Sequence, residues 1–133
     1  MENRKPIPET DREKEFIERL TKEAVLTAVR RHAGGLRHIF GPTGKKTVAE
    51  GKDLTNVKYI IGTGGALTRL PKRVEILSSI PYDNTGDMFL YPKKGVKVLI
   101  DNYYIMASLG VLSKKHKEAA LKLLMESLGL EGA

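Results

Sequence analysis

The stretch Val57-Lys58-Tyr59-Ile60-Ile61-Gly62-Thr63-Gly64-Gly65-Ala66-Leu67 decides the fold, because an apolar run meets a glycine-rich turn there. Val57–Ile61 predicts a largely buried strand, and the residues after Gly65 can begin a helix. Such a turn places bare backbone N–H groups at the carboxyl edge of a strand, where open α/β sheets bind ligands. Glycine lacks a Cβ, so a flat ring or a phosphate can lie against its main chain. The alternative is a tight strand-to-helix turn without a ligand.

A second strand is predicted downstream, over Val96–Ile100. Asp101 or Asn102 is expected to cap a helix that runs to about Leu112, and a last helix is expected over 114–128. Strands that alternate with helices indicate α/β layering and a right-handed parallel crossover. We therefore predict an α/β fold whose mixed sheet contains the parallel strands 57–61 and 96–100, with helices packed on it.

Upstream of the glycine turn, the sequence predicts a long helix and a hairpin. Thr10 and Glu13 have the spacing of a capping box, and apolar residues then recur at helical spacing over Asp11–His32. Gly34-Gly35 ends this helix. Leu36–Glu50 contains a central glycine–proline turn and predicts a hairpin beside the sheet.

Size and composition indicate one ordinary domain. The chain has 133 residues, of which 41% are hydrophobic, and residues 10–133 are expected to form a single α/β domain after a flexible lead-in over 1–9. The lack of cysteine excludes disulfides, thiol catalysis and cysteine-held metal sites. The sequence shows no apolar run near the roughly 20 residues that a membrane helix needs, and its N-terminus lacks the apolar centre of a signal peptide. Both observations favour a cytoplasmic protein that binds no membrane.

The net charge of +7 is concentrated in residues 30–100, which hold 13 basic and 5 acidic residues. Such a region attracts nucleic acids, phosphates or acidic proteins. The aromatic residues are few and scattered, without the pattern of a base-stacking surface, so no nucleic-acid partner is expected. A docking module that binds no ligand and contacts an acidic protein through this basic surface is the alternative function.

Several other motifs are weaker candidates for chemistry. Gly62-x-Gly64-x-x-Leu67 ends in leucine and fails as a dinucleotide fingerprint, and the stretch 41–47 fails the spacing of a P-loop. Three cationic side chains beside the glycine turn can face either an anion or solvent: Arg69, Lys72 and Arg73. For three histidines, helix-end and surface roles are favoured over roles as ligands or bases: His32, His38 and His116. Asp101 can either hold a ribose or a water or cap a helix. The roles of His32, His38 and Asp101 stay open, and no catalytic or metal-binding role is assigned.

The segment Tyr59–Pro71 resembles the adenosine motif of actin-like ATPase domains, the group of actin, Hsp70 and the sugar kinases. More closely, the chain resembles the glutamate mutase (methylaspartate mutase) accessory proteins and the related reactivating factor for ornithine aminomutase. Three further stretches carry this resemblance, which extends from about Phe16 to Leu130: 31–34, 49–55 and 98–112.

The resemblance implies a fold and a function. The chain would be the C-terminal part of an actin-like, ribonuclease H-like ATPase domain in a longer protein, and ATP or ADP would bind to that protein. On this resemblance, the adenosine side of the nucleotide would be lined by Gly62, Thr63, Gly64 and Gly65, and Leu67 would lie in the same nucleotide-binding segment. The phosphate loops and the acidic magnesium-binding residue of actin-like folds have no counterpart here, so this chain alone is not expected to be catalytic.

The resemblance also implies partners. A chaperone-like accessory factor would bind the subunits of an adenosylcobalamin-dependent mutase or aminomutase and use ATP-driven opening to release damaged cofactor, by analogy with the diol dehydratase reactivases. The N-terminal part of the same protein would be a second partner. Association as a homodimer is a further expectation, because a partial lobe exposes apolar surface.

Overall fold

Helix α1 spans Asp11–His32 in the computed structural model, which describes residues 7–130 of the chain. Its predicted capping box is confirmed: the Glu13 N–H donates to the Thr10 hydroxyl at 3.2 Å, and the Thr10 N–H donates to the Glu13 carboxylate at 3.1 Å. The backbone N–H groups of Thr10 and Glu9 both donate to the Glu13 carboxylate and hold the pKa of Glu13 below its usual value. Residues 1–6 of the predicted flexible lead-in lie outside the described residues.

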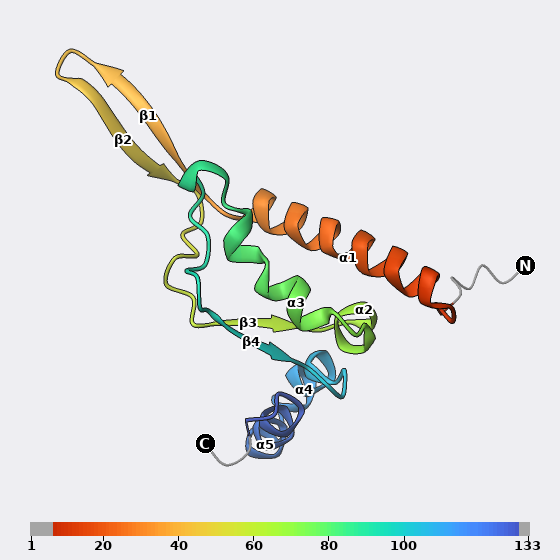
Figure 1. The fold of residues 1–133 in the computed structure, drawn as a ribbon. Coiled ribbons are helices and arrows are strands. Elements are labelled where there is room, and N and C mark those ends of the chain that lie inside the picture. Colours follow the sequence, from red (N-terminus) through yellow and green to blue (C-terminus); the bar gives the residue numbers. More distant parts are fainter. Residues whose placement is uncertain (1–6, 131–133) are drawn as a thin grey trace, which may run out of the picture.

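The predicted hairpin is also confirmed. Strands β1 (Gly35–Gly41) and β2 (Gly44–Glu50) pair antiparallel, from Gly35 opposite Glu50 to Gly41 opposite Gly44. Figure 1 shows this hairpin projecting away from the rest of the molecule. Most of its residues are exposed, because both of its faces point to solvent.

The two central strands run parallel, as predicted, but the single mixed sheet is wrong. Strands β3 (Tyr59–Gly62) and β4 (Lys97–Ile100) pair in register from Tyr59 opposite Lys97 to Gly62 opposite Ile100. Within residues 7–130 this pair and the hairpin form two separate two-stranded sheets. At its base the hairpin hydrogen-bonds to the segment around Met88.

The helix expected after Gly65 is present, whereas the two helices after β4 are shorter than the sequence predicts. After β3 come α2 (Gly65–Arg69) and α3 (Arg73–Ser78), followed by the 3₁₀ turns η1 (Ile80–Asp83) and η2 (Thr85–Asp87). After β4 come α4 (Met106–Leu112) and α5 (Lys117–Ser127). Helix α4 starts later than expected because residues 102–105 first form a turn. Helix α5 starts later because the backbone N–H groups of residues 114–116 bond back to the end of α4.

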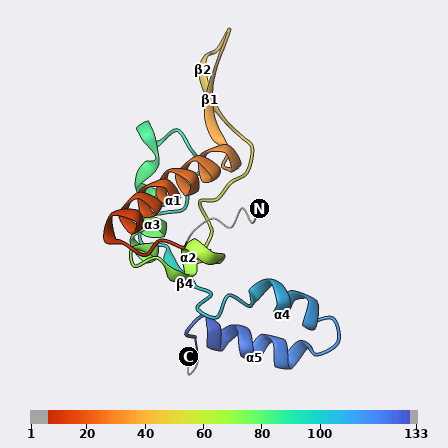
Figure 2. The same ribbon diagram turned by 90° about the vertical axis from the view of Figure 1, so that its right-hand side faces the viewer.

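The core lies between α1, α3 and the β3–β4 pair, which Figure 1 shows as successive layers. Leu77, Ile80 and Ile100 form its buried centre. Partly buried side chains from α1, from α2 and from the two strands surround that centre: Val25, Leu26, Val29, Ile60, Leu67 and Val98. Figure 2 shows the antiparallel pair α4–α5 on the other side of β4, close to its carboxyl end.

Among the described residues, no helix is both long and apolar enough to cross a membrane. Helix α1 is the longest, but charged residues recur along it and its Phe16 and Leu20 are 65% and 56% exposed.

The junction between α1 and the hairpin depends on Gly34. A Cβ at this position would lie 2.7 Å from the carbonyl carbon of Gly51 and 2.8 Å from the nitrogen of Lys52. We expect Gly34→Ala to lower the free energy of unfolding by about 1–3 kcal/mol, because backbone atoms must move apart to admit the methyl group. Urea denaturation followed by circular dichroism measures this change.

Gly41→Ala is the matched control, since a Cβ at Gly41 would meet no atom within 4 Å. Equal unfolding midpoints for the two variants would contradict the close packing at Gly34.

Candidate functional site

The glycine bend follows β3, and its first glycine serves the core. Gly62 is buried, and a Cβ on it would lie 2.6 Å from Cδ1 of Leu77 and 3.1 Å from Cδ1 of Ile100. Leu67 is half-buried and packs against the same cluster. These two predicted site residues therefore support the bend from behind, where they hold α2 and α3 against the sheet.

Gly64 and Gly65 present bare main chain to open space. Gly64 has φ +91° and ψ 160°, a conformation that glycine adopts without strain, and it directly precedes α2. A Cβ on either glycine would meet no atom within 4 Å. The Thr68 hydroxyl donates to the carbonyl of Gly64 at 2.8 Å and so stabilises the bend from within. The geometry that the sequence predicts, a strand that leads into an open glycine turn, is present.

Thr63, between the buried and the open glycines, connects the bend to β4. Its hydroxyl donates to the Asp101 carboxylate at 2.9 Å, while the Asp101 N–H donates to the carbonyl of Gly62 at 2.9 Å. Since the hydroxyl proton is used in this way, the Thr63 oxygen can only accept a further hydrogen bond.

The Asp101 side chain is fully buried, and its carboxylate accepts four hydrogen bonds. Besides Thr63, the donors are the Ser127 hydroxyl at 2.6 Å, the Met106 N–H at 3.0 Å and the Ile105 N–H at 3.2 Å. Burial raises the pKa of Asp101, but these four donors outweigh it and the pKa lies below that of an ordinary aspartate. The expectation that Asp101 or Asn102 is the N-cap residue of this helix is wrong, because Ile105 holds that position, but the Asp101 carboxylate holds the turn before α4 and has no exposed edge.

Ser127 is the residue that sequence reasoning missed. It is fully buried at the end of α5, and its carbonyl also accepts the Asn102 N–H at 3.1 Å and the Asn102 side-chain amide at 2.9 Å. A serine in the last turn of a helix carries no sequence signal for this role, since its partners lie about 25 residues away.

The cationic side chains after the bend are used in different ways. The Lys72 ammonium lies 3.7 Å from the buried Glu18 carboxylate of α1, which also accepts the Lys72 N–H at 3.0 Å. Arg73 donates to the carbonyl of Leu70 at 3.1 Å, and Arg69 is exposed at the end of α2. Lys72 and Arg73 therefore connect α3 to its surroundings.

The histidines do not gather with other potential ligands. His32 ends α1, His116 precedes α5, and Nδ1 of the exposed His38 lies 3.1 Å from the Thr47 hydroxyl. Within the described part of the chain, no three His, Cys, Asp or Glu side chains are close enough to hold a metal ion.

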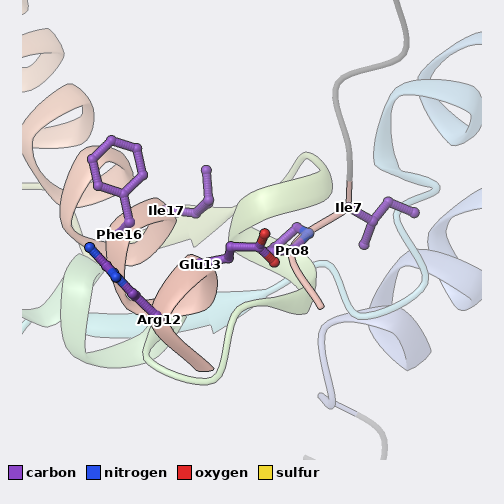
Figure 3. Close-up of a pocket in the computed structure, with 6 residues that line it drawn as sticks. All are labelled: Ile7, Pro8, Arg12, Glu13, Phe16 and Ile17. Atoms are coloured by element: carbon purple, nitrogen blue, oxygen red, sulfur yellow. The ribbon is translucent and has the colours of Figure 1, made fainter. Parts of the chain in front are cut away.

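An apolar hollow lies at the start of α1. It has a volume of about 280 Å³, and Figure 3 shows the six side chains that line it: Ile7, Pro8, Arg12, Glu13, Phe16 and Ile17. None of the residues 62–67 takes part in it, so it is not the predicted nucleotide site.

Comparison with known proteins identifies relatives. Residues 1–128 match the family described as MutL protein. "Protein MutL" of Clostridium tetanomorphum is 34% identical over 127 residues, which cover 96% of this chain and 27% of that protein. The chain thus spans about a quarter of the length of this relative. No solved structure matches.

The Asp101 network predicts a specific dependence of stability on pH. The pKa of Asp101 is lower in the folded protein than in the unfolded chain, where it is about 3.9. The carboxylate therefore stabilises the fold above about pH 4, and this contribution is lost as the pH falls through the folded pKa. We expect Asp101→Asn to lower the free energy of unfolding by about 1–3 kcal/mol at pH 7. Wild type and variant should converge in acid.

Urea denaturation at a series of pH values measures this effect. Glu23→Gln, which removes an exposed carboxylate of α1, is the matched control and should leave the unfolding midpoint unchanged. A stability loss in Asp101→Asn that is constant from pH 7 to about pH 3 would contradict a role for the charge.

Proposed function

Because this chain belongs to the MutL protein family, the glutamate mutase accessory proteins, we propose that it is the adenine-nucleotide-binding portion of a chaperone-like accessory factor. The factor would reactivate an adenosylcobalamin-dependent mutase or aminomutase in the cytoplasm, with ATP or ADP as its ligand. The observation that carries the proposal is the open main chain of Gly64-Gly65 at the carboxyl end of a strand in a parallel pair.

The local geometry supports a nucleotide at this bend. The carboxyl edge of parallel strands is where open α/β sheets bind their ligands, and glycines let a purine approach the backbone closely. In this proposal Gly64 and Gly65 form the flat contact, and the Thr63 oxygen accepts a hydrogen bond from a ribose hydroxyl or an adenine amino group. Gly62 and Leu67 act indirectly, because they fix the bend on the core.

The rest of the nucleotide site would come from outside this chain. We propose that residues 10–133 form one domain that is the C-terminal part of an actin-like ATPase domain in a longer protein. The match to only 27% of the relative's length supports the longer protein in this proposal. The phosphate loops and the magnesium-binding carboxylate would then belong to the N-terminal part, so that ATP hydrolysis requires both parts.

Gly65→Val tests the site most cleanly. The substitution fills the open space beside the bend, yet the added atoms meet no neighbour within 4 Å at the Cβ and the backbone needs no positive φ. Gly64→Val also blocks the site, but there the backbone at φ +91° would be strained. We expect Gly65→Val to weaken ADP binding about tenfold or more, with an unchanged melting temperature. Calorimetric titration of ADP into the longer protein that carries the substitution measures this.

Gly41→Val is the control, since Gly41 also has open space around it and lies at the far end of the hairpin. Equal ADP affinity in the Gly65 variant and the wild type would exclude the bend as the nucleotide site.

Absence of ADP binding to the wild type would favour the second candidate function, a docking module that binds no ligand. The exposed basic hairpin is the observation that supports this second function.

A further inference from the structure

The β1–β2 hairpin is attached firmly at its base. The Gly34 N–H donates to the carbonyl of Lys52 at 2.7 Å, and the Gly34 carbonyl accepts the N–H of Leu90 at 2.8 Å. The Leu36 N–H donates to the carbonyl of Met88 at 2.7 Å. The close approach of Gly34 to Gly51 leaves no room for a side chain there. Backbone hydrogen bonds at Gly34 and Leu36 therefore attach the hairpin to the segment 88–90 through β1, while the contacts of Gly34 with Gly51 and Lys52 hold its two ends together.

Beyond this base, the hairpin extends away from the other helices and strands of residues 7–130 (Figures 1 and 2). Phe40 and Ile39, the largest apolar side chains near its tip, are 77% and 54% exposed. A two-stranded hairpin is only marginally stable alone in water, and these side chains gain no burial from the fold. Large apolar groups at the end of a projecting, well-anchored arm are typical of a contact surface.

The register determines which charges accompany these apolar groups. Phe40 lies opposite Lys45 and Ile39 opposite Lys46, so each face of the tip carries one apolar side chain and one lysine. Nearer the base, Arg37 and Glu50 form an ion pair at 2.7 Å and neutralise each other. The excess positive charge of the hairpin is therefore at the tip, on both faces.

We propose that the tip of the β1–β2 hairpin docks into an apolar pocket rimmed by carboxylates on the surface of a partner protein. Phe40 and Ile39 would enter the pocket, and Lys45 and Lys46 would pair with the carboxylates on its two sides. A nucleic acid fits this tip less well, because phosphate contacts are made by cationic and polar groups and would leave Phe40 and Ile39 exposed. The proposal rests on the proposed function for its partner, a glutamate mutase subunit.

Binding of purified glutamate mutase subunits to the immobilised chain, measured by biolayer interferometry, tests the docking surface. One variant carries Ile39→Ser with Phe40→Ser, and a second carries Lys45→Glu with Lys46→Glu. The control carries Lys114→Glu with Lys115→Glu, two exposed lysines in the turn between α4 and α5. We expect each hairpin variant to bind about tenfold more weakly or worse, and the control to bind as the wild type does. Added salt should weaken wild-type binding more than that of the Lys45/Lys46 variant.

The outcomes separate the docking proposal from the proposed function. Wild-type affinity in both hairpin variants would overturn the hairpin as the docking element, while the mutase partnership would stand. No binding of the wild type to the subunits would overturn both, whereas the ADP titration would still report on the nucleotide site. A gel shift of DNA or RNA that disappears in the Lys45/Lys46 variant would instead assign the tip to nucleic acid. Thermal melting checks the fold of each variant, and the lysine variant keeps the test valid if the apolar variant is unstable.

Discussion

The buried carboxylate of Asp101 is the interaction on which the rest of the structure depends. It accepts hydrogen bonds from the glycine bend, from the turn before α4 and from the end of α5. A buried charge is stable only when such donors replace its hydration, so the three segments have to meet at this point. The position of the open bend and the attachment of the α4–α5 pair are consequently coupled through a single side chain.

Three glycines show how the same residue type serves different physical needs. Gly62 gives Leu77 and Ile100 room to pack, Gly34 lets two backbone segments approach closely, and Gly64 adopts a positive φ beside open space. Of these, only Gly64 leaves its main chain accessible to a ligand. A glycine-rich motif therefore identifies a candidate site, but the surroundings of each glycine decide whether it faces a ligand or the core.

The elements that the sequence predicts well are those stabilised by short-range interactions. The bounds of α1 follow from its capping box and its apolar spacing, and the β1–β2 hairpin follows from its central turn. The late start of α4 and the separation of the two sheets were not predictable in this way. The turn before α4 is held by Asp101, whose carboxylate accepts the Met106 N–H and the hydroxyl of the distant Ser127. The hairpin is bound at its base to another distant segment, where the Leu36 N–H donates to the carbonyl of Met88.

By itself, the sequence determined the α/β class, the parallel pairing of the strands before and after the crossover, and the strand that leads into a glycine bend. These features follow from residue spacing and turn chemistry. Only the tertiary structure decided which glycines are open, why Ser127 is buried, and that the hairpin tip is exposed. These properties depend on which side chains meet across the fold, and the hydrogen-bonding capacity of a residue does not specify its partner.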